Sequence, residues 1–396
     1  MNLIKITVNK SLRKQMQDFD LVVVGAGIIG ASVCWHATQK GLRVAVIDSI
    51  GPAAAASGAS DGAVSVASKR PGLVSDLAYE SLAYTETLAQ KGGPLYGVFH
   101  KRPSYFFASN EQEDAALDQL KIKLASLGDG VRVVADGRCA DGILTGLGQS
   151  VNRIVKLEGE GHMLGYFATQ AYLDSAKPTF FWRESVTAID ENDDGVLVHC
   201  QSQKIRARAV VCAMGVMSGQ FFGQLPVVPR AGQLIVTDVV AQGQPVLDGA
   251  LTAGAYLISK TDANVVPDAL PIVIDPLTTG QFLIGSSRES HGRSDLTDLN
   301  AIQSLLRRAV DIYPVLRHQR VIRTFTGVRA AVKDGLPILG LMPQKKRTWM
   351  ATGFEGDGIC LSAWIGRTVC EGLAGAHDAR LLAISPSRFG LSVGST

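Results

Sequence analysis

A strand, a glycine-rich turn, a helix and a second strand are predicted to follow one another over residues 20–48. The apolar run 21–24 leads into GAGIIG at 25–30, and a second apolar run ends at Asp48. In a turn of this type the first glycine permits the sharp bend, the second lets the backbone approach a pyrophosphate, and the third lets helix and strand pack closely. The phosphates would lie at the positive end of the helix. The unit therefore predicts a dinucleotide-binding site that contains Gly25, Ala26, Gly27, Ile28, Ile29 and Gly30.

Asp48 stands at the end of the second strand, 18 residues after Gly30. An acid in this position accepts hydrogen bonds from a ribose. Its charge would repel a 2′-phosphate, so a ligand of the NADP type is not expected here. The alternative is a glycine-rich turn in an unrelated α/β protein, but the flanking strand, helix and acid all favour the dinucleotide site.

The chain is long and apolar for a single core. Its 396 residues are 46% hydrophobic and 19% charged. This predicts two domains, or one domain with a large insertion, and is compatible with a multi-subunit assembly. The formal net charge of +3 comes from interspersed acids and bases, so we expect no nucleic-acid partner.

Six cysteines are scattered through the chain with no C-x-x-C pair: Cys34, Cys139, Cys200, Cys212, Cys360 and Cys370. We expect neither a metal site nor a disulfide framework from this spacing, and reduced thiols are typical of a cytoplasmic protein. Residues 1–17 lack the apolar core of a signal peptide, and no run of about 18 apolar residues occurs. We therefore predict a cytoplasmic protein with no transmembrane segment and with a loosely ordered tail over residues 1–17.

The rest of the chain alternates between two kinds of strand pattern. Continuous apolar runs, typical of buried parallel strands, occur at 208–214 and 348–352, and the second precedes the glycine-rich loop 353–358. Alternating runs, typical of an antiparallel sheet with one covered face, occur at 233–238, 255–259, 271–274 and 281–286. Further strands are expected at 105–108, 185–189 and 195–200, and helices at 76–91, 111–127 and 359–373.

These patterns predict an α/β fold of mixed α+β type, in which a Rossmann-like domain is interleaved with an antiparallel-sheet domain. We expect the Rossmann-like domain to comprise 18–95, 151–225 and 324–396, and the antiparallel-sheet domain to comprise 96–150 and 226–323. Small residues at 51–63, in the run GPAAAASGASDGA, would let a flat ligand lie close to the backbone, although a flexible surface loop is the alternative.

Nine motifs, taken in order, resemble the FAD-dependent D-amino-acid oxidase superfamily. They are DLVVVGAGIIGAS, AAASGASDGAV, EGEGHM, RAVVCAMG, GQLIVT, FLIGSSRE, GVRAAVKDGLPILG, ATGFEGDGICLS and ISPSRFG. Their order and spacing cover almost the whole chain after residue 18. The superfamily includes glycine oxidase, sarcosine oxidase and the catalytic β subunits of heteromeric opine, hydroxyproline and amino-acid dehydrogenases.

The resemblance implies a non-covalent FAD, with Gly25, Gly27 and Gly30 at the pyrophosphate and Asp48 at the adenosine ribose. It also implies that Ser57, Gly58, Ala59 and Ser60 pass the phosphates and ring, that Val186 flanks the adenine, and that Gly215 ends the strand beneath the cofactor. The later loop would contribute Gly353, Glu355, Gly356, Asp357, Gly358 and Ile359, the last four beside the pyrimidine edge of the flavin. Cys360, on the helix side of this loop, is not placed for covalent attachment. A second flavin, FMN, at a subunit interface is left open because no motif specifies it.

Two residues are candidates for substrate binding. Arg329 stands where related oxidases place an arginine that binds the substrate carboxylate, since a guanidinium matches a carboxylate bidentately; the alternative is a structural salt bridge. Tyr256 is a weaker candidate for an active-site hydroxyl, because aromatic residues in strands usually belong to the core. For His162 we expect a local hydrogen bond rather than catalysis. Phe354 departs from the family pattern, in which many relatives have histidine.

The implied reaction is hydride transfer from the Cα of a small amino acid or secondary-amine acid to the flavin. The substrate would be an opine, a D-amino acid, a proline derivative, glycine or sarcosine. The GFEGDGI loop favours a catalytic β subunit of a multi-subunit dehydrogenase, whose partner subunits would carry further redox centres. The alternatives are a stand-alone oxidase that uses O2, a non-catalytic FAD-holding subunit, and a flavoprotein that acts on tRNA or on a hydroxy acid.

Overall fold

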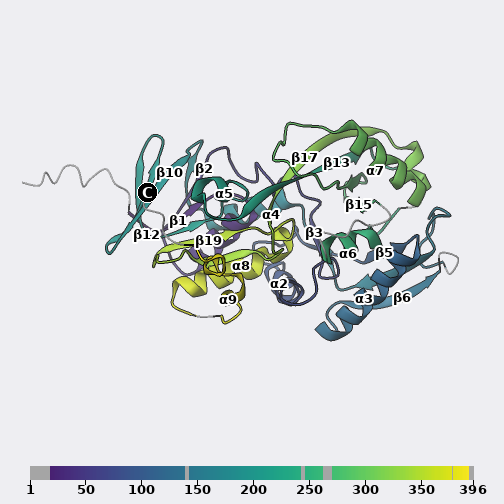
Figure 1. The fold of residues 1–396 in the computed structure, drawn as a ribbon, viewed down its shortest axis with the longest axis horizontal. Helices are drawn as coiled ribbons and strands as arrows, with labels where there is room; N and C mark the ends of the chain where they lie inside the picture. The colour runs from purple at the N-terminus through teal and green to yellow at the C-terminus, as the bar shows by residue number, and fades with distance from the viewer. Residues whose placement is uncertain (1–17, 139–141, 242–245, 262–269, 377, 392–396) are drawn as a thin grey trace, which may run out of the picture.

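Two lobes lie side by side along the long axis of the molecule (Figure 1). The computed structural model describes residues 18–138, 142–241, 246–261, 270–376 and 378–391. One lobe is built on a mostly parallel sheet and the other on a mostly antiparallel sheet. The mixed α/β fold expected from the sequence is therefore confirmed, whereas the tail at 1–17 and Cys139 lie outside the described residues.

The first lobe contains an eight-stranded sheet with the order β10-β11-β12-β1-β2-β9, extended by β19 alongside β12 and β18 alongside β19. Its strands are β1 (Asp18–Val24), β2 (Val44–Asp48), β9 (Thr179–Trp182), β10 (Val186–Asn192), β11 (Gly195–Cys200), β12 (Lys204–Cys212), β18 (Ile338–Leu341) and β19 (Thr348–Thr352). Strands β12, β1, β2 and β9 pair in parallel, and so do β12 and β19. Residues 21–24 are all buried, as expected where both faces of a parallel sheet are covered.

Helix α1 (Ile28–Gln39) packs between α4 (Gly165–Ala176) and α8 (Gly358–Leu373), and α8 also contacts α2 (Leu73–Leu88). Gly366 permits the close approach of α8 to α1, because a Cβ at this position would lie 2.3 Å from Ser32 Oγ. The chain segments that form these helices are far apart in sequence but share one buried core.

The second lobe contains an eight-stranded sheet with the order β17-β13-β16-β15-β14-β5-β7-β6. Its strands are β5 (Ser104–Ala108), β6 (Arg132–Arg138), β7 (Arg153–Glu158), β13 (Val227–Thr237), β14 (Ala250–Ala253), β15 (Val273–Pro276), β16 (Phe282–Gly285) and β17 (Val321–Val332). All neighbours pair antiparallel except β14 and β5. Its helices are α3 (Glu111–Leu127), α6 (Gly254–Thr261) and α7 (Leu299–Ile312).

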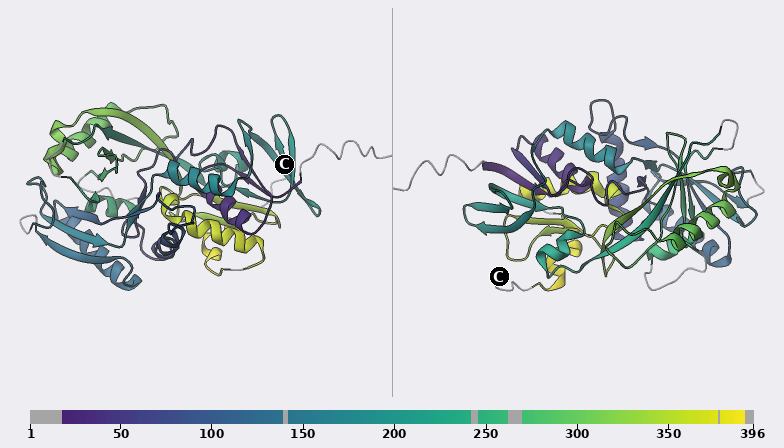
Figure 2. Two further views of the ribbon diagram at one scale, coloured as in Figure 1. Left: turned by 180° about the vertical axis from the view of Figure 1, so that it is seen from behind. Right: turned by 90° about the horizontal axis from the view of Figure 1, so that it is seen from above.

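Strands β13 and β17 are long enough to connect the two lobes (Figures 1 and 2). Their paired ends Val227 and Val332 are buried in a core cluster of the first lobe, whereas Ile235 of β13 is buried in the core of the second. Arg329 lies on β17 near its first-lobe end. The pair thus carries Arg329 to the junction of the lobes.

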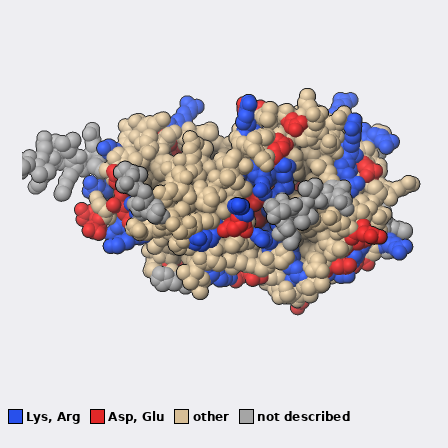
Figure 3. Space-filling model, viewed as in Figure 1, with Lys and Arg blue, Asp and Glu red and all other residues tan. Residues whose placement is uncertain are grey.

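Several smaller elements complete the described chain: β3 (Ala63–Val64), β4 (His100–Lys101) and β8 (Gly161–His162), which form a three-stranded sheet, and α5 (Met217–Phe222), η3 (Pro314–His318), α9 (Leu381–Ile384) and η4 (Pro386–Phe389). Acidic and basic side chains are interspersed on the face shown in Figure 3. Within the described ranges, no helix has the length and apolar character required to cross a membrane.

Most predicted elements are confirmed, including α3, β11 and β19 with the expected bounds. One prediction is wrong: the run 255–259 is not a strand but lies within helix α6. Two of the expected domain boundaries do not coincide with the ends of the strands. β7 belongs to the second sheet although it begins after the expected boundary at residue 150, and β17 continues across the expected boundary at residue 323.

Candidate active site

The turn after β1 has the geometry required at a dinucleotide. Gly25 has a φ of +104°, and a Cβ on it would lie 2.4 Å from the carbonyl oxygen of Ala213. A Cβ on Gly30 would lie 2.0 Å from the carbonyl oxygen of Gly25. Helix α1 begins after Gly27, which has no side chain to cap the first turn, and Gly27, Ile28 and Ile29 line the adjoining cavity. The backbone itself therefore forms a cradle for an anionic group.

Asp48 and Ser57 hold this turn in place. Asp48 Oδ2 accepts the amide of Ala26 at 2.8 Å, and its Oδ1 accepts the amides of Ile50 and Gly51, each at 2.8 Å. Ser57 Oγ accepts the amide of Ile28 at 2.9 Å. Both side chains also line the cavity. Asp48 is thus oriented by three backbone donors, and one acceptor site on its Oδ2 is left for a ligand.

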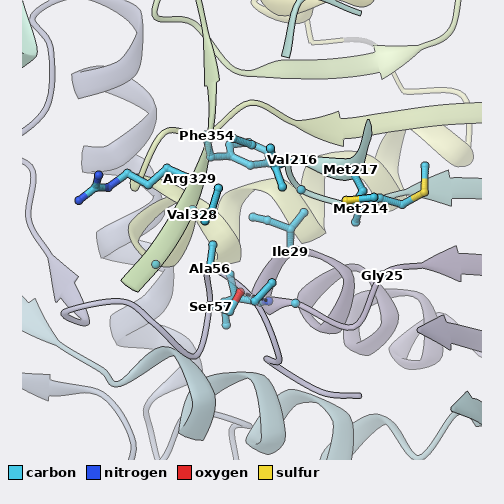
Figure 4. Close-up of a pocket in the computed structure, with 18 of the residues that line it drawn as sticks. Gly25, Ile29, Ala56, Ser57, Met214, Val216, Met217, Val328, Arg329 and Phe354 are labelled. Carbon is cyan, nitrogen blue, oxygen red and sulfur yellow. Dashed lines mark hydrogen bonds between the residues drawn. The ribbon is translucent and has the colours of Figure 1, made fainter. Parts of the chain in front are cut away.

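A cavity of about 680 Å³ extends from Asp48 at the end of β2 to Arg329 on β17. Figure 4 shows Ser57 among the lining residues at the bottom of the view, Ile29 in the middle, and Phe354 and Val216 above it. Of the residues predicted to bind the cofactor or substrate, those in its wall are Gly25, Gly27, Ile28, Ile29, Asp48, Ser57, Ala59, Ser60, Val186, Gly215, Tyr256, Arg329, Glu355, Gly356, Gly358 and Ile359. Five others lie behind the wall: Ala26, Gly30, Gly58, Gly353 and Asp357. The elongated cavity and its cradle at one end fit a dinucleotide that carries a flat ring.

Arg329 is partly buried and has no carboxylate partner among the described residues. Its Nη1 donates to the carbonyl oxygens of Ala231 and Ser287 at 3.3 and 3.5 Å, and its Nη2 donates to Ser286 Oγ. Burial lowers the pKa of Arg329, but a guanidinium remains protonated in proteins. The predicted alternative, a structural salt bridge, is therefore not what this structure contains, and an unneutralised cation faces the cavity.

Two acids of the glycine-rich loop are engaged by cations of the protein. Glu355 accepts hydrogen bonds from Arg230 and Arg288. Asp357 Oδ1 accepts Lys260 Nζ at 2.9 Å and lies 3.2 Å from Lys69 Nζ. These contacts fix the loop at the start of α8 against both lobes.

The Lys69–Asp357–Lys260 cluster is almost excluded from solvent, with side-chain exposures of 4%, 14% and 9%. Burial alone would raise the pKa of Asp357, but Lys260 and Lys69 hold it below its ordinary value. Burial alone would lower the pKa of Lys69, but the Asp357 carboxylate raises it. Asp357 and Lys69 are therefore charged at neutral pH, and Lys69 brings a positive charge to the cavity wall.

Tyr256 lies on the first turn of α6 and lines the cavity. His162, buried in β8, has its Nε2 2.9 Å from the carbonyl oxygen of Asp61, which is the local hydrogen bond that we expected. Lys69, Lys260 and Asp61 were not predicted as site residues, although Asp61 lies within the motif AAASGASDGAV. No spacing rule connects them, because they come from separate loops and helices that meet only in the folded chain.

The thiols in the described part of the chain offer no ligand set for a metal ion. Cys34, Cys200, Cys212, Cys360 and Cys370 are free and buried. Among the residues that the structure describes, no group of three or more His, Cys, Asp or Glu side chains could hold a metal ion.

Residues 20–372 match the family described as FAD dependent oxidoreductase. The chain is 23% identical to the glycine oxidase of Bacillus subtilis (strain 168), over 89% of this chain and 92% of that protein. It is also 23% identical to an opine oxidase subunit of Agrobacterium tumefaciens (strain Ach5), over 82% and 85% of the two chains. The crystal structure of glycine oxidase from Geobacillus kaustophilus superposes with a TM-score of 0.80 at 22% identity, covering 92% of this chain and 96% of that one.

Proposed function

Because the chain belongs to the family of FAD dependent oxidoreductases, with FAD as its cofactor, we propose that it dehydrogenates a small amino acid or secondary-amine acid. The observation that carries the proposal is Arg329, a partly buried guanidinium that lines the cavity without a carboxylate partner in the described chain. A substrate carboxylate would neutralise it through two parallel hydrogen bonds. The relatives named as a glycine oxidase and as a subunit of opine oxidase support a substrate of this class.

The residues of the chain would act mainly by orientation and by excluding water. Arg329 fixes the carboxylate, and the hydrogen bonds to Ala231, Ser286 and Ser287 fix Arg329. Val328 and Phe354 provide apolar wall beside it (Figure 4), so the Cα–H bond would be held in one direction. Bound FAD supplies the two-electron acceptor. Loss of the Cα hydrogen with two electrons from the neutral amine leaves an iminium ion. It becomes an imine when it loses its N–H proton, and water hydrolyses it unless it is cyclic.

Residues 353–359 and Lys69 would hold the cofactor. The loop precedes helix α8, whose first residues, Gly358 and Ile359, line the cavity. Together with the Lys69 ammonium they would stabilise negative charge at the adjoining edge of a flavin ring.

The test is the anaerobic visible spectrum of the purified holoprotein, recorded with glycine, sarcosine, D-amino acids, proline derivatives and opines, and with lactate and glycerol 3-phosphate for comparison. We expect one class of amine to bleach the flavin band, and neither hydroxy compound to do so. Bleaching by a hydroxy compound alone would refute the proposal, and a flavin that no amine reduces, even after partner subunits are added, would favour the non-catalytic alternative.

Arg329→Met isolates the role of the carboxylate ligand. We expect at least a tenfold loss in kcat/KM for the reducing amine, about the value of one charge-assisted hydrogen bond. Arg132→Met is the matched control, because the Arg132 side chain is 62% exposed and far from the cavity wall. Equal kinetics for the two variants would refute the assignment of Arg329.

We further propose that the chain is the catalytic subunit of a multi-subunit dehydrogenase in the cytoplasm. Two relatives are named as subunits of larger enzymes, one of opine oxidase and one, HcnC of Pseudomonas aeruginosa, of hydrogen cyanide synthase. The substrate-reduced holoprotein should then react slowly with O2 and rapidly with a soluble dye acceptor. Rapid consumption of O2 would instead identify a stand-alone oxidase. Release of FMN in addition to FAD from the assembled complex would reveal a second flavin.

A further inference from the structure

Asp61 lies at the end of the small-residue loop, where the loop joins β3, and it is held in place through its backbone. Its carbonyl oxygen is hydrogen-bonded to His162 Nε2, and its Oδ1 accepts the amide of Ala63 at 3.2 Å. The following residue, Gly62, has a φ of +82°, and a Cβ on it would lie 2.8 Å from His162 Nε2. The turn therefore presents the Asp61 carboxylate in one fixed position on the cavity wall.

The Asp61 carboxylate and the Arg329 guanidinium are unmatched charges of opposite sign in one cavity. Neither makes an ion pair with a residue that the structure describes, although both line the space in which the substrate would bind. The Asp61 charge contributes to raising the pKa of Arg329, against the larger effect of burial, so the two groups lie within electrostatic range of each other. Two opposite charges that lack partners at one partly buried cavity favour a ligand that compensates both.

A second, smaller cavity of about 30 Å³ adjoins the first, and Asp61, Ala63, Ser68 and Tyr256 line both. Its volume is enough for about two water molecules. Ser65, Ser104 and Glu160 line its other side, and the Glu160 carboxylate accepts both hydroxyls at 2.9 and 2.5 Å. Water in this chamber would therefore contact polar groups and would reach Asp61, whereas Arg329 lines only the larger cavity.

We propose that Asp61 binds the amino group of the substrate and accepts its extra proton, which makes Asp61 a catalytic residue. The inference rests on the proposed amine oxidation. In the step, the N–H bond of the substrate ammonium breaks, its electron pair stays on nitrogen, and the proton forms an O–H bond with the Asp61 carboxylate. A water molecule of the small chamber then takes the proton. The neutral amine that remains has the lone pair required to form the imine.

Opposite unmatched charges select a zwitterion. A carboxylate with an adjacent ammonium neutralises both Arg329 and Asp61, whereas a hydroxy acid neutralises only Arg329 and leaves a desolvated carboxylate beside its hydroxyl. In the complex with a hydroxy acid, the charge of Asp61 would have no counter-charge. Asp61 would therefore favour the binding of amines over that of alcohols.

The test compares two shape-matched ligands that cannot be oxidised as amino acids: 2-aminoisobutyrate, which has no Cα hydrogen, and pivalate, in which a methyl group replaces the ammonium. Their dissociation constants are measured on holoprotein from the flavin difference spectrum for wild type, Asp61→Asn and Asp61→Glu. Asp76→Asn is the control, because Asp76 is an exposed residue in the first turn of α2.

We expect Asp61→Asn to raise the dissociation constant of 2-aminoisobutyrate about tenfold or more and to change that of pivalate by no more than about twofold. Asp61→Glu should partly restore the affinity for 2-aminoisobutyrate. Equal weakening of both ligands would assign Asp61 a structural role and overturn the inference, as would an unchanged preference or no binding of 2-aminoisobutyrate to wild type. If amines reduce the flavin equally in wild type and Asp61→Asn, the inference fails alone. If no amine reduces the wild-type flavin although 2-aminoisobutyrate binding depends on Asp61, the proposed reaction fails and the amine site stands.

Discussion

Asp357 is the residue on which two buried ammonium groups depend. Its carboxylate lies between Lys69 and Lys260, at 3.2 and 2.9 Å. Asp357→Asn would leave both lysines buried without an anion, and breaking a buried ion pair by removing one partner costs about 3 to 5 kcal/mol. We expect urea unfolding at pH 7 to show a loss of at least about 3 kcal/mol, whereas Asp295→Asn, at an exposed ion pair, should change stability little.

The Asp357 carboxylate also makes the stability of the folded protein depend on pH. Because Lys260 and Lys69 outweigh burial and keep the pKa of Asp357 below its ordinary value, its contribution to stability is complete above the unfolded pKa of about 3.9. That contribution is lost as the pH falls through the lower folded pKa. The stability difference between wild type and Asp357→Asn should therefore shrink as the pH is lowered below about 4. A difference that stays constant down to pH 2 would contradict the assignment.

Some residues of the candidate site could be predicted from the sequence and others could not. Arg329 was identifiable because it lies in the motif GVRAAVKDG. Lys69 and Asp61 lie in the cavity wall too, but nothing in SDGAVSVASK separates them from charged residues on a surface. Their role depends on tertiary burial, which places Lys69 against Asp357, 288 residues later in the chain.

At the scale of elements, the first turn of α1 offers a matched pair of substitutions. Gly27 has an ordinary φ of −75°, and a Cβ on it would meet only Ser57 Oγ at 3.1 Å. A Cβ on Gly30 would meet backbone oxygen at 2.0 Å. We expect Gly27→Ala to fold but to lose FAD affinity about tenfold or more, because the methyl group occupies the approach of the pyrophosphate. Gly30→Ala should fail to accumulate as folded protein.

Circular dichroism and FAD titration distinguish these outcomes. Gly41→Ala is the control for a glycine of positive φ with open space around it, and it should cost about 1 kcal/mol with unchanged FAD affinity. Normal FAD binding by folded Gly30→Ala would contradict the packing argument.

Helix α6 explains the one wrong element. Ala255, Leu257 and Ser259 alternate with Tyr256 and Ile258 in a pattern that predicts a strand, yet the segment is helical. The fully buried Glu113 of α3 accepts the amide of Ala255 at 3.1 Å. An acid at this position satisfies an amide at the start of a helix and favours the positive end of its dipole. The deciding contact is thus 142 residues away and has no trace in the local pattern.

For the whole molecule, the cofactor should contribute to the stability of both lobes, since residues from both line its cavity. We expect FAD to be non-covalent. Burial raises the pKa of the Cys360 thiol to about 11, so it is not a thiolate nucleophile at neutral pH. Acid precipitation should leave yellow supernatant and a colourless pellet.

Removal of FAD should then lower the Tm. Added FAD at 100 times its Kd should restore about 2.7 kcal/mol of stability, and calorimetry as a function of FAD concentration measures this. A coloured pellet, or a Tm that does not respond to FAD, would contradict a dissociable cofactor shared by the lobes.

The overall architecture was predictable because two strand patterns alternate along the chain and the glycine-rich turn at 25–30 specifies one of the two layers. The order of the strands was not. β1 lies between β2 and β12, and β12 also pairs with β19. Apolar strands of similar composition carry no local mark of their neighbours, so this order follows only from packing the complete chain.

The parallel pairing of β12 with β19 has a consequence for biosynthesis. β1 leaves the ribosome early, its neighbour β12 follows about 190 residues later, and β19 with helix α8 follows about 140 residues after that. The sheet of the first lobe therefore cannot be completed, and the edge of β12 stays unpaired, until nearly the entire polypeptide has been synthesised. Such long-range closure slows folding and makes the growing chain a natural client of ribosome-associated chaperones.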